Sequence, residues 1–365
     1  TDPAMNGHIS FTTFLYGREM MGGQTQRNVS FVPADICDYG TFMAEYRPRN
    51  TFVACVSPMD DHGYFQLGLT NMWESASFKT CDTIILNGAE CETFLTADFR
   101  LMIEHSGKIV DGLRAVMRAL NVKRGVIAIE DNKPEAIEAM RKAASGREGV
   151  EIAVMRTKYP QGGEKQLIKA VTGREVPSGK LPIEVHTIVM NVGTAAAVAD
   201  AVIDGRPLID RITTVTGCVQ HPANLRLRIG TIIADVIGEC GGFSEEPGKI
   251  VFGGGMTGLC VPDTDVPMTK ANNGIVVYNV KDARSVDESP CIRCGRCVEA
   301  CPIGLDPYRI KHYCDRGDLA SAKEHHVMDC ILCGCCSYNC PARRWLTASF
   351  KNTKDAIALE ARRKK

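Results

Sequence analysis

The residues with the clearest chemistry are eight cysteines that form two runs near the end of the sequence. Both runs have the spacing Cys-x-x-Cys-x-x-Cys-x-x-x-Cys-Pro, and their members are Cys291, Cys294, Cys297 and Cys301, then Cys330, Cys333, Cys336 and Cys340. In this bacterial iron–sulfur spacing, the fourth cysteine of each run binds the cluster of the other run. The spacing therefore predicts two [4Fe–4S] clusters, one bound by Cys291, Cys294, Cys297 and Cys340 and the other by Cys330, Cys333, Cys336 and Cys301.

A pair of structural zinc sites is the alternative interpretation of these cysteines. Zinc requires only two Cys-x-x-Cys hairpins, so the two proline-terminated runs favour iron–sulfur clusters. Gly295 and Gly334 let the loops fold tightly while backbone N–H groups donate to sulfide. Cys314 and Cys335 lie outside the spacing and are expected to be packed thiols or modifiers of cluster potential. We predict a helix between the runs, over Pro307–Lys323.

The composition is that of an ordinary globular chain. Its 365 residues suggest several domains at ~100–200 residues each, and 44% hydrophobic residues exclude wholesale disorder. Lys plus Arg (43) balance Asp plus Glu (43), so no net charge attracts nucleic acid. No apolar run reaches the ~18 residues of a transmembrane helix. The sequence shows no export signal, so the 17 cysteines indicate a reducing compartment. We predict a cytoplasmic protein, either free or peripheral on the cytoplasmic face of a membrane.

Strand and helix patterns alternate in the region that must position any substrate site. Apolar runs predict strands over 83–87, 125–130 and 150–155, with helices over 99–120 and 134–144 between them. Such alternation is typical of a parallel α/β sheet. The predicted divisions of the chain are residues 1–80, an α/β domain at 81–180, a smaller α+β unit at 181–285, a mainly helical iron–sulfur domain at 286–350 and a charged tail at 351–365.

Three polar loops follow predicted strands, at the edge where open parallel sheets bind ligands. The first holds Asn87, Gly88, Glu90 and Glu92, the second Tyr159, Gly162, Gly163 and Glu164, and the third Asn191 and Thr194. The first loop has groups that could hydrogen-bond a flavin ring or a nicotinamide ribose, or it is simply a turn before a capped helix. The glycine pair of the second loop could let a phosphate approach the backbone. The third loop could reach the same crevice.

Residues from about 82 to 350 resemble the C subunit of the Rnf electron-transport complex, which is related to the flavoprotein subunit of respiratory complex I. The stretches that carry the resemblance are Ile85-Leu-Asn-Gly-Ala-Glu-Cys-Glu92, Tyr159-Pro-Gln-Gly-Gly-Glu164, Thr172-Gly-Arg-Glu-Val-Pro177, Thr214-Val-Thr-Gly217, Gly248-Lys-Ile-Val-Phe-Gly-Gly-Gly-Met256 and the two cysteine runs. The resemblance implies that FMN binds at the sheet edge, that NADH supplies hydride, and that electrons pass singly to the clusters. It also implies a soluble-ligand-binding β-grasp unit within residues 181–285 and a two-cluster ferredoxin domain.

The resemblance assigns roles to the polar loops. The catalytic residues Glu90 and Glu92 would face the flavin and nicotinamide together with Asn87 and Gly88. The second loop would line the same cleft through Tyr159, Gly162, Gly163 and Glu164, and the third would hold the flavin phosphate side through Asn191 and Thr194. The expected partners are other subunits of a redox complex and a ferredoxin or flavodoxin-like carrier, with no nucleic acid.

Two other functions remain open at this stage. The family places a glycine-rich loop of the form Gly-Gly-Ala-x-Phe-Pro before its first strand, and no such loop precedes Asp82. That departure favours a polyferredoxin adaptor that passes electrons without binding a nucleotide. Residues 1–80 instead resemble a fragment of an acetyl-CoA hydrolase or 4-hydroxybutyrate CoA-transferase, through Phe31-Val-Pro33 and Val53-Ala-Cys-Val-Ser-Pro-Met-Asp-Asp-His-Gly-Tyr64. The third candidate is therefore a CoA-transferase with a ferredoxin tail.

Overall fold

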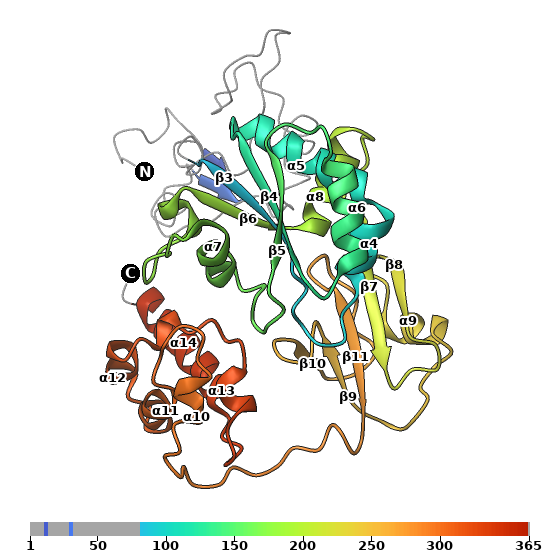
Figure 1. Ribbon diagram of the computed structural model, residues 1–365. Coiled ribbons are helices and arrows are strands. Elements are labelled where there is room, and N and C mark those ends of the chain that lie inside the picture. The colour runs from blue at the N-terminus through green and yellow to red at the C-terminus, as the bar shows by residue number, and fades with distance from the viewer. Residues whose placement is uncertain (1–10, 14–28, 32–80, 364–365) are drawn as a thin grey trace. The chain divides into compact units, whose positions relative to one another are not determined.

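The structure is a computed structural model that describes residues 11–13, 29–31 and 81–363 (Figure 1). The chain divides into two compact units, Thr1–Glu74 and Ser75–Lys365. In the first unit, strands β1 (Phe11–Thr13) and β2 (Val29–Phe31) pair in parallel. Apart from these strands, the CoA-transferase-like segment at residues 1–80 lies outside the described residues. Within the described ranges, no helix is long and apolar enough to span a membrane.

A parallel sheet of four strands forms the first part of the second unit. The strands lie in the order β5-β4-β3-β6, and their bounds are β3 (Thr83–Gly88), β4 (Arg124–Glu130), β5 (Val150–Met155) and β6 (Thr187–Asn191). The parallel α/β sheet predicted from the sequence is confirmed, because its first three strands match the predicted runs. Since all four strands run the same way, the loops that follow them meet at one edge.

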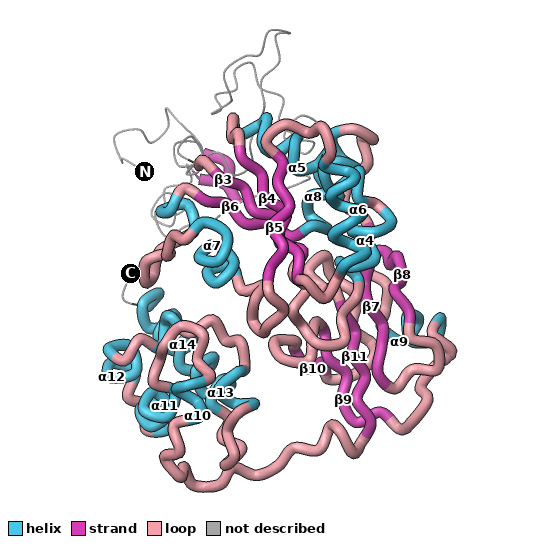
Figure 2. The backbone as a smooth tube through the Cα atoms, viewed as in Figure 1, coloured by secondary structure: helices cyan, strands magenta, loops and turns pink. Residues whose placement is uncertain are grey.

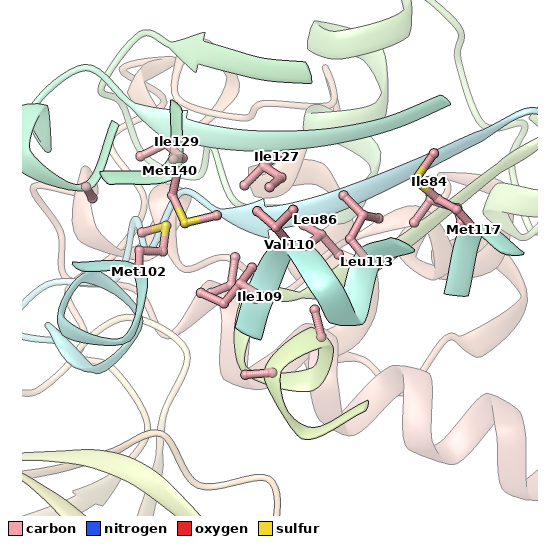
Figure 3. Packing of buried hydrophobic residues seen from close by; sticks show 14 of the residues in the cluster. Ile84, Leu86, Met102, Ile109, Val110, Leu113, Met117, Ile127, Ile129 and Met140 are labelled. Carbon is pink, nitrogen blue, oxygen red and sulfur yellow. The ribbon is translucent and has the colours of Figure 1, made fainter. Parts of the chain in front are cut away.

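Helices cover both faces of this sheet (Figures 1 and 2). Their bounds are α4 (Ala97–Glu104), α5 (Ser106–Leu120), α6 (Pro134–Ala144), α7 (Glu164–Thr172) and α8 (Val192–Val202). Side chains alternate along a strand, so Ile84 and Leu86 pack with α4, α5, α6 and α8, as Figure 3 shows, while Ile85 packs with α7. The single helix predicted over 99–120 is wrong, because His105 (φ −129°) breaks it into α4 and α5.

Close packing of α5 against α8 depends on a glycine. Gly112 lies so near α8 that a Cβ atom there would overlap the carbonyl oxygen of Ala195. We expect Gly112→Ala to lower the free energy of unfolding by about 2 kcal/mol, because the two backbones must separate in a packed core. Gly107→Ala on the same helix is the matched control, since its Cβ would meet nothing within 4 Å. Thermal unfolding followed by circular dichroism tests this packing, and equal midpoints for the two variants would contradict it.

A second, mixed sheet follows the parallel one. Its strands lie in the order β10-β9-β11-β7-β8, and their bounds are β7 (Asp210–Gly217), β8 (Ala223–Arg228), β9 (Pro247–Phe252), β10 (Leu259–Val261) and β11 (Gly274–Asn279). Helix α9 (Ile233–Glu239) packs into its core through Ile233, Val236 and Ile237. The domain boundary predicted at residue 180 is too early. Strand β6 pairs with β3 and α8 packs on α5, so the parallel-sheet domain continues to about Val202.

The C-terminal region is mainly helical, as predicted. After the 3-10 turn Pro182–Val185 of the sheet domain, the remaining elements are α10 (Arg296–Glu299), α11 (Pro307–Asp315), α12 (Leu319–Glu324), the 3-10 turn Val327–Asp329, α13 (Cys335–Tyr338) and α14 (Leu346–Arg363). The helix predicted over Pro307–Lys323 is wrong, because Gly317 (φ 66°) separates α11 from α12. The tail predicted at 351–365 is not separate either. Helix α14 begins within the cysteine domain and buries Phe350 beside α11.

Candidate redox centre

The two cysteine runs fold in the same way. In each run the amide two residues after the first cysteine donates to its Sγ, from Arg293 to Cys291 and from Leu332 to Cys330, both at 3.4 Å. Arg293 and Leu332 have φ of 54° and 56°, and the glycines two residues further on, at 295 and 334, also have positive φ before a short helix. Each loop therefore curls around its thiols with amides turned toward sulfur, as an iron–sulfur cluster requires.

The fourth cysteine of each run lies with the other run. Burial raises the pKa of Cys297, and the neighbouring Cys336 and Cys340 raise it further. Burial likewise raises the pKa of Cys330, which Cys333 and Cys301 increase, while Lys354 opposes the rise. We call Cys291, Cys294, Cys297 and Cys340 the outer thiol group, and Cys330, Cys333, Cys336 and Cys301 the inner thiol group. The proximity of Cys340 to Cys297 and of Cys301 to Cys330 agrees with the crossed pattern of the spacing, and thiolates are the ligands that cubanes take.

Lys354 lies beside the inner thiol group. Its Nζ donates to the carbonyl oxygen of Cys330 at 2.6 Å and to that of Met328 at 3.1 Å. A reduced cluster carries one more negative charge than an oxidised one, so a fixed cation here favours reduction. The outer thiol group differs in that Cys291 and Cys294 are exposed.

We expect Lys354→Met to make the inner cluster harder to reduce. A tenfold change in its one-electron equilibrium corresponds to about 59 mV, and we expect a negative shift of about this size. Lys351→Met is the matched control, because Lys351 is exposed on the same helix and pairs with Asp355 at 2.9 Å. Potentiometric titration followed by electron paramagnetic resonance measures both variants. Equal shifts in the two, or none in either, would show that Lys354 does not tune the cluster.

At the sheet edge, the first and second polar loops are joined. Asn87 donates from Nδ2 to the carbonyl oxygen of Gly162 at 2.9 Å, and its Oδ1 accepts from the amide of Ala89 at 3.2 Å. The amide of Gly162 donates to Sγ of Cys91 at 3.2 Å. A Cβ on Gly162 would lie only 3.1 Å from that sulfur, so the two loops approach closely at this glycine. Strand β3 ends at Gly88, where a Cβ would lie 2.7 Å from Sδ of Met102.

Glu90 lies at the start of α4. Its two carboxylate oxygens accept from the amides of Asp98 at 2.7 Å and Phe99 at 2.9 Å. Burial, and secondarily the charge of Asp98, raises the pKa of Glu90 to about 7. Both oxygens are thus engaged by a helix N-terminus, which is the capping arrangement that the sequence left open as the alternative to ligand contact.

The third polar loop contacts α4 instead of the first two loops. Asn191 caps α8 by accepting from the amide of Gly193 at 2.7 Å, and its Nδ2 donates to Oδ2 of Asp98 at 2.7 Å. Thr194 lies in the first turn of α8 and lines a cavity of about 170 Å³ together with Asp98 and Arg211. Asn191 and Asn87 are register partners on neighbouring strands, so the three loops share one edge.

The second loop connects the first polar loop, residues 87–92, which we call the acidic loop, to the inner thiol group. The hydroxyl of Tyr159 donates to the carbonyl oxygen of Cys333 at 2.7 Å. Burial raises the pKa of Tyr159, and the nearby Glu92 and Cys333 raise it further. Glu92 in turn accepts from the amide of Met256 at 3.1 Å and from the hydroxyl of Thr257. Tyr159 therefore lies between a candidate substrate loop and a ligand of the inner group.

Gly163 and Glu164 begin α7. Gly163 is its N-cap and Glu164 its first residue, and burial raises the pKa of Glu164. Among the described residues, Oε1 of Gln166 is buried without a hydrogen-bond partner, and a Cβ on Gly163 would lie 2.6 Å from it. A flavin ring carries both N–H donors and carbonyl acceptors. An unpartnered acceptor beside bare glycine backbone therefore fits such a ring at this edge.

Some residues of this edge were missed in the sequence. A Cβ on Gly254 would overlap Glu92, so this glycine lets residues 253–255 pack closely against the acidic loop. Lys133 donates to the carbonyl oxygen of Ala89 at 2.9 Å and lies 3.5 Å from the buried carboxylate of Glu130. Strand β4 ends at Glu130, and ligands of open parallel sheets bind at the carboxyl ends of the strands, so the sequence could have indicated Glu130 as a residue of this edge.

Comparison with known proteins supports a single assignment. Family models match residues 68–200 (Nuo51 FMN-binding domain), 212–259 (SLBB domain) and 285–305 (4Fe-4S binding domain). The C subunit of the proton-translocating ferredoxin:NAD(+) oxidoreductase complex of Clostridium ljungdahlii is 49% identical over 249 residues, which are 68% of this chain and 54% of that protein. The C subunit of the Na(+)-translocating complex of Acetobacterium woodii is 46% identical over 286 residues, which are 78% of this chain and 65% of that protein. Over this region, the chain is similar to the C subunits of ion-translocating ferredoxin:NAD(+) oxidoreductase complexes.

The remaining comparisons agree with this similarity. The C subunit of the ion-translocating oxidoreductase complex of Rhodobacter capsulatus is 46% identical, over 77% of this chain and 55% of that protein. The chain thus spans 54–65% of the length of these relatives. A crystal structure of an NAD+-reducing [NiFe]-hydrogenase has the same fold, with a TM-score of 0.53 at 20% identity over 77% of this chain and 58% of that one. The CoA-transferase likeness of residues 1–80 finds no support in these matches.

Proposed function

We propose that this chain is an electron-transfer subunit of an Rnf-type complex. It would carry electrons from NADH through FMN to two [4Fe–4S] clusters and on to ferredoxin, a flavodoxin-like carrier or a membrane partner. The observation that carries the proposal is the hydrogen bond from Tyr159 to the carbonyl of Cys333, because it connects the sheet edge with a cluster ligand. The relatives, named as subunits of ferredoxin:NAD(+) oxidoreductase complexes, support the same function.

The sheet edge has the groups that such a function needs. FMN, when bound, converts the two-electron hydride of NADH into single electrons that a cubane can accept. Gly162 and Gly163 would leave room for the flavin ring and Tyr159 would lie against it, with Asn87 and Glu92 holding the loops around it. Thr194, at the start of α8, would lie on the phosphate side. Glu164 would complete the same cleft.

Two of the predicted roles take a more specific form in this proposal. Glu90 would position α4 and the acidic loop, since both its oxygens bind that helix. Glu92 remains the candidate for contact with nicotinamide, because its loop adjoins Tyr159. The inner thiol group would receive electrons first and the outer group would pass them on. The mixed sheet would form the β-grasp unit, and the chain would act as a peripheral subunit on the cytoplasmic face of the membrane.

Anaerobic purification of the chain tests this proposal. We expect a visible spectrum with flavin and iron–sulfur bands, about eight iron atoms per chain, and bleaching on addition of NADH. Two zinc atoms with negligible iron would overturn the proposal. Bleaching by dithionite but not by NADH, with iron and no flavin, would instead indicate the second candidate function.

That second candidate is a nucleotide-free polyferredoxin adaptor between redox partners. The absence of a glycine-rich loop directly before Asp82 favours it. The hydrogen bonds that Asn87 and Glu90 make within the chain also agree with it, because both side chains have partners without a ligand.

A further inference from the structure

The two cysteine loops share a backbone shape but differ in charge. The first reads Cys-Ile-Arg-Cys-Gly-Arg and the second Cys-Ile-Leu-Cys-Gly-Cys. Leu332 therefore stands where the first loop has Arg293, and Cys335 where it has Arg296. In the second loop these side chains are half-buried and buried, and a Cβ on Gly334 would lie 3.2 Å from the carbonyl oxygen of Met256. The second loop thus packs against the rest of the chain.

The first loop is open. Ile292 is 68% exposed, and both arginines of the loop are exposed, as are Cys291 and Cys294. Within residues 81–363, neither Arg293 nor Arg296 has an ion-pair or hydrogen-bond partner for its guanidinium. Ile292, exposed beside two unpaired arginines in the loop that carries Cys291 and Cys294, has no packing role among the described residues.

The start of α11 extends this surface. Ile310 of α11 shares a buried cluster with Cys297, and the backbone N–H of Tyr308 opposes the rise in the pKa of that thiol, so the start of α11 lies near the outer thiol group. Tyr308 is 40% exposed, and the adjacent Arg309 is exposed with no side-chain partner in the described part of the chain. We call Ile292, Arg293, Arg296, Tyr308 and Arg309 the outer docking surface.

We propose that the outer docking surface binds an acidic one-electron carrier protein. The inference rests on the proposed function, because it needs an iron–sulfur cluster at the outer thiol group. Three unpaired arginines outnumber the two acids of residues 291–309, Glu299 and the half-buried Asp306, so the surface is complementary to a negative partner. Small, electrostatically steered interfaces are typical of transient redox encounters. In the transfer step the outer cluster loses one electron and the carrier gains it, with no bond broken and no proton moved.

Charge reversal on the two helices of the surface tests the inference. The variant is Arg296→Glu with Arg309→Glu, and the control is Arg118→Glu with Arg141→Glu, which makes the same charge change on exposed positions of α5 and α6. The cluster-loaded chain is reduced, freed of reductant and mixed in a stopped-flow apparatus with an oxidised acidic two-cluster ferredoxin. We expect the surface variant to react at least tenfold more slowly at low ionic strength, with a weaker dependence on salt. The control should react like the unchanged chain.

Further measurements keep the outcomes distinct. Iron content and reoxidation by a small neutral quinone should be unchanged in the surface variant, and Arg296→Lys with Arg309→Lys should restore the ferredoxin rate. If the surface and control variants were slowed equally, the slowing would come from the net charge of the protein and not from this surface, which would overturn the inference. An unchanged ferredoxin rate would overturn it as well, and an altered oligomeric state would then identify the surface as an interface between copies of this chain. Absence of clusters in the unchanged chain would be a failure of the proposed function instead.

Discussion

Replacing Cys340 by alanine is expected to remove the cluster of the outer thiol group and leave electron entry intact. Cys301→Ala should instead remove the cluster of the inner thiol group and abolish NADH-dependent reduction of the chain. The reason is the crossed arrangement, in which Cys301 lies with Cys330 and Cys340 with Cys297. Each variant should retain about four of eight iron atoms, because each loses one ligand of one cubane. The inner group adjoins the Tyr159 contact, so in the proposed function the cluster there would receive electrons first.

Iron analysis and anaerobic titration with NADH distinguish the two variants. Cys314→Ala serves as the control, because Cys314 lies on α11 outside the ligand spacing and both clusters should survive its loss. If Cys340→Ala lost NADH-dependent reduction while Cys301→Ala kept it, the order of the two clusters would be reversed. If both variants kept all their iron, the crossed ligation itself would be wrong.

The sequence predicted the strands of the parallel sheet well because their residues are buried on both faces. Ile84, Ile85 and Leu86 are fully buried, and such continuous apolar runs are typical of parallel strands covered by helices on both sides. The breaks in helices were not predictable in the same way. At His105 and at Gly317, the helical spacing of apolar residues continues past the break. Periodicity alone therefore predicts one helix where the structure has two.

The domain boundary at residue 180 failed for a different reason. A parallel sheet can receive a strand after a long connection, and β6 returns beside β3, about 100 residues later in the chain. The amino-acid composition changes near residue 180. The pairing of β6 with β3, however, depends on contacts between residues far apart in the sequence, which local composition does not indicate. The boundary lies instead after α8, whose Ala195 packs against Gly112.

At the candidate site, the sequence predicted which loops meet but not what each side chain does there. Three loops after parallel strands must share an edge, and Asn87 does contact Gly162. The roles of the carboxylates depend on distant partners. Glu92 binds the amide of Met256, which lies 164 residues away, and no short-range motif encodes that contact. Tyr159 reaches Cys333 across 174 residues in the same way.

Glu90 gives the clearest test of such a reassigned role, through the dependence of stability on pH. Its pKa is raised to about 7 in the folded chain, from the ordinary value of 4.5, chiefly by burial. The folded state therefore holds the proton more tightly than the unfolded state. The resulting stabilisation is complete below pH 4.5 and is lost as pH rises through 7. At 1.36 kcal/mol per pKa unit, the loss is about 3 kcal/mol.

Glu90→Gln should remove most of this dependence, because the amide cannot ionise and still accepts one helix amide. We expect the thermal midpoint of the unchanged chain to fall between pH 5 and pH 8 by several degrees more than that of the variant, with cluster content checked in each sample. Glu138→Gln is the control, since Glu138 is exposed on α6 and its removal should leave the pH dependence as it is. A pH dependence that is the same in all three chains would mean that Glu90 is solvated and free to meet a ligand. A flattened dependence, together with an unaltered rate of flavin reduction by NADH, would establish that this carboxylate supports α4 and leaves the chemistry to Glu92 and Tyr159.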